Sequence, residues 1–145
     1  MSLIGLVHGP NLNLLGQREI DIYGTTTEAD LIALVEKTAA AHGHQVEFVQ
    51  SNHEGQLVDW VHAARGRCAA IVINGGALSH YGWSLHDALA TFEGPVVEVH
   101  LSNTGTREPW RHTSVLTPVS NGTITGLGPH GYELAIEAIA RLLNQ

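Results

Sequence analysis

The chain has 145 residues, of which 43% are hydrophobic and 14% are charged, and its net charge is −7. This length suits a single domain spanning residues 1–145, and the apolar share is large enough for a core, which excludes a disordered chain. Seven Lys and Arg residues do not provide the basic face that nucleic-acid binding needs, and no apolar run approaches the ~18 residues of a membrane span.

The first residues, Met1 to Gly5, carry no charged leader or cleavage site, so we expect a mature cytoplasmic chain. The single cysteine, Cys68, excludes an internal disulfide, and we expect it to be buried as a small hydrophobic residue. Ten histidines against seven Lys and Arg residues make the charge of the protein sensitive to pH near neutrality.

Apolar runs alternate with helical patterns along the whole chain. In chain order, the pattern predicts strand 3–7, helix 28–41, strand 46–49, helix 54–65, strand 69–73, helix 83–92, strand 96–99, a weaker strand 123–125 and helix 132–143. Strands separated by helices form a parallel sheet with helices on both faces. Five strands in this length predict a flavodoxin-like, three-layer α/β fold with order 2-1-3-4-5, in which ligands bind beyond the carboxyl ends of the first, third and fourth strands.

The loop after the first predicted strand is much longer than the usual 2–6 residues of a strand-to-helix connection. It carries two neutral polar residues, Asn11 and Asn13, and places Arg18 and Tyr23 on one segment. An arginine held against a phenol favours the ionised phenolate and can make it a base. The alternative, which the spacing alone favours, is a tyrosine packed under the loop with its arginine in solvent.

The loop after the third predicted strand begins with Asn74, Gly75 and Gly76 and continues through His80 toward Asp87 in the next helix. Two glycines after an asparagine allow the backbone to approach a ligand closely at the point where the strand order reverses. A flexible turn with surface histidines is the alternative.

The fourth predicted strand ends with Glu98 and His100, which are two residues apart and therefore point to one face. A carboxylate on one ring nitrogen fixes the tautomer of the histidine and supports its protonated form, as a general acid requires. The alternative is a histidine at a strand end whose hydrogen-bonding capacity is merely satisfied by its neighbour.

Two other patterns are better explained without a ligand. Residues 126–131 match G-x-G-x-x-G, but the motif lies in the last unit with no acidic residue about 20 positions later, so it predicts a turn and a helix entry. His80, His86, Asp87 and His100 lack the spacing of metal ligands, and we predict no metal site.

Several motifs occur together in the order of one enzyme family. They are residues 9–16 (GPNLNLLG), 18–19 (RE), 23–24 (YG), 50–55 (QSNHEG), 87–89 (DAL), 98–103 (EVHLSN), 107–108 (RE), 111–112 (RH) with Ser114, 126–128 (GLG) and 131–132 (GY). On these residues the chain closely resembles the type II 3-dehydroquinate dehydratases over nearly its whole length. The resemblance implies a flavodoxin-like fold and a cofactor-free lyase of the shikimate pathway that removes water from 3-dehydroquinate by anti elimination through an enolate.

The resemblance also implies a role for each site residue. The catalytic group would contain Tyr23 as the phenolate base, Arg18 to stabilise the phenolate and the transition state, Asn11 to hold a water at the enolate oxygen, His100 as the general acid and Glu98 to orient it. The substrate-binding group would contain Asn74, His80, Asp87 and Arg111 for hydroxyls, and Leu101 and Ser102 for the carboxylate. His8, where many relatives have Asn, is expected to lie behind the catalytic residues.

The family assembles trimers into dodecamers, and its Asp87 equivalent reaches into a neighbour's site. This sequence departs from the family pattern at Gly75, at residues 79–83, at His86, at residues 104–106 and at residues 109–110, which we expect to alter the rim of the site and the trimer contacts. The alternatives are a catalytically weak relative and a flavodoxin-like binding or signalling module. A receiver-type module requires acidic residues where this chain has His8 and Asn74.

Overall fold

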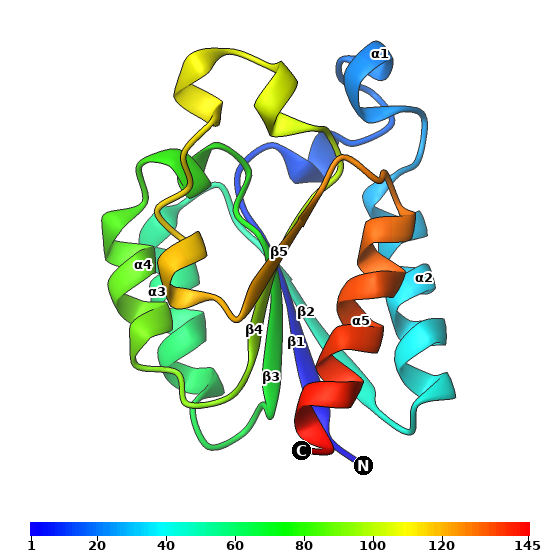
Figure 1. The fold of residues 1–145 in the computed structure, drawn as a ribbon, viewed down its shortest axis with the longest axis vertical. Helices are drawn as coiled ribbons and strands as arrows, with labels where there is room; N and C mark the ends of the chain where they lie inside the picture. Colours follow the sequence, from blue (N-terminus) through cyan, green and yellow to red (C-terminus); the bar gives the residue numbers. More distant parts are fainter.

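A computed structural model describes residues 1–145, and at its centre lies a five-stranded parallel sheet (Figure 1). The strands are β1 (Leu3–His8), β2 (Gln45–Gln50), β3 (Ala70–Asn74), β4 (Val96–His100) and β5 (Gly122–Thr125). Their order across the sheet is β2-β1-β3-β4-β5, and every neighbouring pair is parallel. The predicted flavodoxin-like fold and strand order are confirmed.

Helices cover both faces of the sheet, as Figure 1 shows. On one face lie α2 (Glu28–Ala41) and α5 (His130–Leu143), and on the other lie α3 (Glu54–Ala64) and α4 (Trp83–Ala90). Each face has its own core, because successive strand residues point to opposite sides of the sheet. Ile4 and Leu6 of β1 pack with the α2 and α5 side, whereas Val7 packs with the α3 and α4 side. None of the helices combines the length and apolar character that a membrane crossing needs.

Local sequence signals explain why the helices begin and end where they do. The hydroxyl of Thr27 accepts from the backbone N–H of Asp30, and the Asp30 carboxylate accepts from the backbone N–H of Thr27, so α2 begins with a capping box and has the predicted bounds. The helix predicted to reach Phe92 ends at Ala90, where the Thr91 N–H caps the last turn.

Each of the first four strands ends with a polar residue that lies just beyond its predicted end. These last residues of β1, β2, β3 and β4 are His8, Gln50, Asn74 and His100. His8 stands in register with both Gln50 and Asn74, and His100 stands opposite Thr125. Because all strands are parallel, these polar side chains meet at one edge of the sheet, where the fold places its ligands.

The connections at the carboxyl edge of the sheet are built from short helical turns. The long loop after β1 contains a 3-10 turn, Leu12–Leu14, and a short helix, α1 (Ile20–Tyr23). The connection after β3 forms a 3-10 turn, Gly76–His80, and the long segment between β4 and β5 forms three more, at Thr104–Thr106, Pro109–Arg111 and Thr117–Val119. The loop after β1 contacts the end of β3, where the Gly9 N–H donates to the Asn74 carbonyl (2.9 Å).

Candidate active site

A small cavity of about 100 Å³ lies at the carboxyl edge of the sheet, between the loop after β1 and the segment after β4. Nine of the eleven predicted site residues line it: Asn11, Arg18, Tyr23, Asn74, His80, His100, Leu101, Ser102 and Arg111. A larger hollow of about 700 Å³ lies at the opposite end of the strands and contains none of them. The chemistry-bearing residues therefore gather where the strand order predicted them.

Tyr23 lies between two guanidinium groups at this cavity. Arg107 Nη1 donates to the Tyr23 hydroxyl at 2.6 Å and to Ser102 Oγ at 3.2 Å. Arg18 stacks on the ring instead, with its Cζ atom 4.5 Å from the ring centroid, and its Nη2 donates to Glu19. The phenolic oxygen is thus held by a charge-assisted hydrogen bond from one side, while a second positive charge covers the ring face.

Arg107 is the residue that the sequence reasoning missed. Its place in the Arg107–Glu108 motif was the only signal, because neither its spacing nor its neighbours indicate that it reaches Tyr23. The resemblance assigns Arg18 to stabilising the phenolate and the transition state, and the structure places its guanidinium over the ring face of Tyr23. The side chain of Arg107 is only 9% exposed, compared with 22% for Arg18, so its charge is the less screened of the two.

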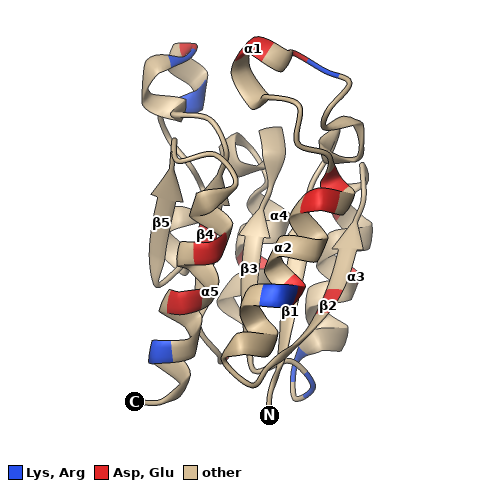
Figure 2. Cartoon of the chain, turned by 90° about the vertical axis from the view of Figure 1, so that its right-hand side faces the viewer, with Lys and Arg blue, Asp and Glu red and all other residues tan.

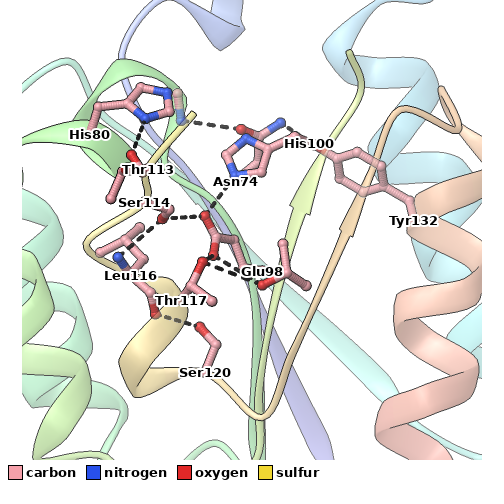
Figure 3. A network of polar contacts seen from close by, with 12 residues as sticks. Asn74, His80, Glu98, His100, Thr113, Ser114, Leu116, Thr117, Ser120 and Tyr132 are labelled. Atoms are coloured by element: carbon pink, nitrogen blue, oxygen red, sulfur yellow. Dashed lines mark hydrogen bonds and ion pairs between the residues drawn. The ribbon is translucent and has the colours of Figure 1, made fainter. Parts of the chain in front are cut away.

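Glu98 and His100 form a buried pair at the end of β4 (Figure 3). Glu98 Oε2 accepts from His100 Nε2 and from the Ser114 hydroxyl, both at 2.6 Å, and Oε1 accepts from the Thr117 hydroxyl at 2.6 Å. Burial alone would raise the pKa of Glu98, but the hydrogen bonds from His100, Ser114 and Thr117 outweigh burial and hold the pKa below its usual value. An ionised Glu98 fixes Nε2 as a donor, which leaves Nδ1 of His100 free to act on a ligand.

His80 is also held in one tautomer. Its Nδ1 donates to the Thr113 carbonyl at 2.8 Å, so Nε2 is the acceptor when the ring is neutral. Burial lowers the pKa of His80, and the nearby charges of His100 and Arg111 lower it further. The His80 ring stacks on His100 with centroids 6.4 Å apart. His80 therefore presents Nε2 as an acceptor beside the His100 ring, whose Nδ1 can donate.

The remaining cavity residues are neutral or cationic. Asn11 has a left-handed backbone (φ 70°), and its N–H donates to the Asn52 side chain at 3.0 Å. Arg111 stacks on Trp110, with Cζ 4.0 Å from the ring centroid, and its Nε donates to Glu108. Together with Arg18 and Arg107, Arg111 makes the cavity lining strongly basic although the chain as a whole is acidic. Figure 2 shows basic (blue) positions above the sheet, both beside α1 and in the segment between β4 and β5.

Asp87 is the one predicted substrate-binding residue that does not line the cavity. It lies on α4, its side chain is 84% exposed, and it accepts from His86 Nδ1 at 3.1 Å. Glu98 is absent from the cavity lining as well, but it contacts the site through His100. Within a single chain, the Asp87 side chain makes no hydrogen bond or ion pair to another predicted site residue.

The glycine-rich pattern of residues 126–131 lies outside the cavity. Residues 126–129 connect β5 to α5, and Gly126 and Gly128 adopt positive φ values of 84° and 60° there, so this segment is a turn and a helix entry. No three His, Cys, Asp or Glu side chains converge in the way that metal binding requires. Cys68 is buried, as predicted.

This flavodoxin-like domain brings a phenol, three guanidinium groups and a carboxylate-bound histidine to one cavity, and these groups suit the class of enzymes that use general acid–base catalysis. Comparison with known proteins narrows the class to one family. The model of the family described as dehydroquinase class II matches residues 2–140. The chain belongs to the class II dehydroquinase family.

Individual relatives agree with this assignment. The chain is 54% identical to 3-dehydroquinate dehydratase 2 of Pseudomonas putida, over 99% of this chain and 96% of the relative. It is 50% identical to 3-dehydroquinate dehydratase of Halalkalibacterium halodurans, over 96% of each chain. The crystal structure of type II dehydroquinase from Propionibacterium acnes superposes with a TM-score of 0.92 at 42% identity, covering 97% of both chains.

Proposed function

We propose that this chain is a 3-dehydroquinate dehydratase, a hydro-lyase that reversibly removes water from 3-dehydroquinate to give 3-dehydroshikimate. The product lies on the shikimate pathway, which leads to chorismate and the aromatic amino acids. The observation that carries the proposal is the pairing, in one basic cavity, of a phenol hydrogen-bonded to Arg107 with a histidine hydrogen-bonded to buried Glu98. This pairing provides a base and an acid from side chains alone, so the proposed reaction needs no cofactor.

Tyr23 is the proposed base. As a phenolate it removes the proton beside the ketone, and the electron pair of the broken C–H bond passes to the carbonyl oxygen, giving an enolate. The Arg107 guanidinium at 2.6 Å and the Arg18 guanidinium over the ring favour the negative charge on the phenolic oxygen. Asn11 is the proposed residue that positions a water against the enolate oxygen.

His100 is the proposed acid. When the enolate collapses, the bond to the departing hydroxyl breaks, and Nδ1 of the protonated His100 supplies the proton that turns the hydroxyl into water. Glu98 stabilises the imidazolium form before this transfer, since its carboxylate accepts from Nε2 at 2.6 Å. Base and acid belong to different elements, α1 and β4. For the anti elimination we propose that they face opposite sides of the bound substrate, from which the proton and the hydroxyl leave.

Binding of the substrate is assigned to the other cavity residues. We propose that Asn74, His80 and Arg111 hold the hydroxyls, and that the Leu101 and Ser102 backbone amides with the Ser102 hydroxyl hold the carboxylate. The neutral His80, with Nε2 as an acceptor, suits a hydroxyl donor. The three arginines of the cavity suit the negative charge of the substrate.

We also propose that the protein assembles as trimers within a dodecamer and that Asp87 completes the site of a neighbouring subunit. Two facts support this. Asp87 is 84% exposed and has no contact with its own cavity, and Trp83, at the start of the same helix, is 63% exposed. Large exposed aromatic side chains are typical of interaction surfaces. A cytoplasmic location is the companion proposal, and the single free cysteine suits a reducing compartment.

The test is the absorbance of the conjugated enone product when the purified protein is mixed with 3-dehydroquinate at neutral pH without added metal. We expect steady formation of product by the wild type. The matched control is Tyr23→Phe, which should keep the circular dichroism spectrum of the wild type while kcat falls by a factor on the order of 10³ or more. Absence of product with excess wild-type enzyme would refute the proposed function.

A further inference from the structure

A second chain of buried polar groups lies behind the cavity, separate from the Glu98 cluster. It comprises Glu28 at the start of α2, His8 at the end of β1, Tyr132 in the first turn of α5 and Asn74 at the end of β3; these four residues are called the buried polar chain below. The consecutive distances are 2.8 Å from His8 Nδ1 to Glu28 Oε2, 2.9 Å from Tyr132 Oη to His8 Nε2 and 3.0 Å from Asn74 Nδ2 to Tyr132 Oη.

The buried polar chain is closed to solvent except at its two ends. His8 and Tyr132 are fully buried, Asn74 is 4% exposed, and the Glu28 side chain is 15% exposed. His8 is further enclosed by the edge of the Phe48 ring, with centroids 5.3 Å apart. Only Asn74 among the four residues lines the cavity (Figure 3 shows its contact with Tyr132).

Only one arrangement of protons gives every hydrogen bond of the buried polar chain one donor and one acceptor. The Glu28 carboxylate accepts only, so His8 Nδ1 carries the proton and donates to it. The other nitrogen, Nε2, then accepts from the Tyr132 hydroxyl, and the Tyr132 oxygen accepts from Asn74 Nδ2. Burial lowers the pKa of His8, opposed in part by Glu28, and burial raises the pKa of Tyr132. A neutral His8 and a protonated Tyr132 are the states that this arrangement needs.

The arrangement fixes the orientation of the Asn74 amide. Its Oδ1 accepts from the Gly76 N–H at 3.1 Å, while one hydrogen of Nδ2 is donated to Tyr132. A flip of the amide would place Oδ1 against the Tyr132 oxygen, whose proton is donated to His8, and Nδ2 against the Gly76 N–H. Both new contacts would be repulsive and buried, so the flip is unfavourable. The second N–H of Asn74 remains available to a ligand.

We propose that His8 and Tyr132 are positioning residues, which hold the Asn74 amide so that its remaining N–H donates to a hydroxyl oxygen of the bound substrate. This inference rests on the proposed function, since Asn74 is there assigned to the substrate. It gives two residues outside the cavity a role in binding, and it makes a definite statement about the tautomer of His8.

The kinetic test uses Tyr132→Phe, which removes one oxygen and leaves the ring in the core. Without the Tyr132 hydroxyl the amide keeps only its contact with the Gly76 N–H and loses the other contact that fixes its orientation, so we expect KM for 3-dehydroquinate to rise about tenfold, with kcat changed by less than about threefold. The matched control is Thr38→Val, which removes a hydroxyl that donates to the Leu34 carbonyl within α2 and has no contact with the cavity. Its KM should equal that of the wild type.

A double variant separates positioning from a general loss of structure. If Tyr132 acts through Asn74, Tyr132→Phe will raise KM in the wild-type background but not in the Asn74→Ala background. If Tyr132 only supports the fold, the two effects will multiply, or KM of Tyr132→Phe will match that of the wild type; either result overturns the inference.

A spectroscopic test examines the buried polar chain in the wild-type protein, where all of its contacts are intact. In wild-type protein labelled with ¹⁵N-histidine at pH 7.5, we expect His8 as the neutral tautomer protonated at Nδ1, with its signals assigned by their loss in His8→Asn. Observation of the Nε2–H tautomer or of an imidazolium would overturn the inference even if Tyr132→Phe failed to fold. No turnover by the wild type would refute the proposed function and this inference together, whereas turnover with an unchanged KM in Tyr132→Phe would refute this inference alone.

Discussion

Arg107 Nη1 lies 2.6 Å from the hydroxyl oxygen of Tyr23, although 84 positions separate the two residues in the chain. The contact joins the segment after β4 to the short helix α1 and is shielded from solvent on the Arg107 side. A guanidinium in this position stabilises a phenolate more than a phenol, because only the charged oxygen gains a charge-assisted hydrogen bond. The relation makes Arg107 a central residue of the proposed proton removal.

Replacement of Arg107 by Met keeps much of the length of the side chain and removes the charge and the donors. We expect kcat for 3-dehydroquinate to fall roughly 100-fold or more, by analogy with loss of one preorganised donor to a developing anion. The absorbance assay for the enone product measures this effect. Arg67→Met, at the opposite end of the sheet where Arg67 pairs with Glu47, is the control and should keep the wild-type kcat. Equal kcat values for the two variants would exclude Arg107 from the mechanism.

The stability of the protein should depend on pH through His8. Burial lowers the pKa of His8 in the folded protein, whereas in the unfolded chain the pKa is about 6.5. As pH falls below that value, the unfolded chain binds a proton that the folded protein excludes, so the free energy of unfolding decreases until the folded pKa is reached. Urea unfolding at pH 7.5 and 5.5 should show a larger decrease for the wild type than for His8→Asn. His80, whose pKa is also lowered, is present in both proteins and cancels in the comparison. Equal decreases would contradict this prediction.

Subunit mixing tests whether Asp87 acts in a neighbour's site. Asp87→Ala and Tyr23→Phe should each be nearly inactive alone. When the two are unfolded together and refolded, an Asp87→Ala subunit beside a Tyr23→Phe subunit regains a complete site, and activity should return to about one quarter of the wild-type value for random assembly. If Asp87 served its own chain, mixing would restore nothing.

Gly75 occupies a position with no room for a side chain. A Cβ atom there would lie 2.7 Å from Ser79 Oγ and 2.9 Å from Leu116 Cδ1, and both neighbours are fully buried. We expect Gly75→Ala to lower the free energy of unfolding by about 1–3 kcal/mol, as other overpacked substitutions do. Gly55→Ala, in helix α3 with open space around the new methyl group, should instead raise it by about 0.5–1 kcal/mol. A Gly75→Ala variant as stable as the wild type would show that Ser79 and Leu116 can move aside.

Much of the fold was predictable because its signals are local. The continuous apolar run of residues 69–73 indicated a strand buried on both faces, and β3 at Ala70–Asn74 confirms it. The capping box at Thr27 likewise determines the start of α2 within four residues of sequence. The pair of Glu98 and His100 was predictable for the same reason, since residues two apart on a strand share a face, and their hydrogen bond is now observed at 2.6 Å.

The sequence by itself therefore determined the five strands and the four longer helices, the order of the strands in the sheet, the edge at which polar residues gather, and the family, but not helix α1 or the 3-10 turns. The tertiary structure decided which of those residues contact each other: Arg107 instead of Arg18 at the phenolic oxygen, and Tyr132 against His8 across 124 positions. The physical reason is that periodicity and capping act over a few residues, whereas these hydrogen bonds depend on how separate loops and helices meet above the sheet. No pattern within a few residues of sequence indicates which distant residues these hydrogen bonds join.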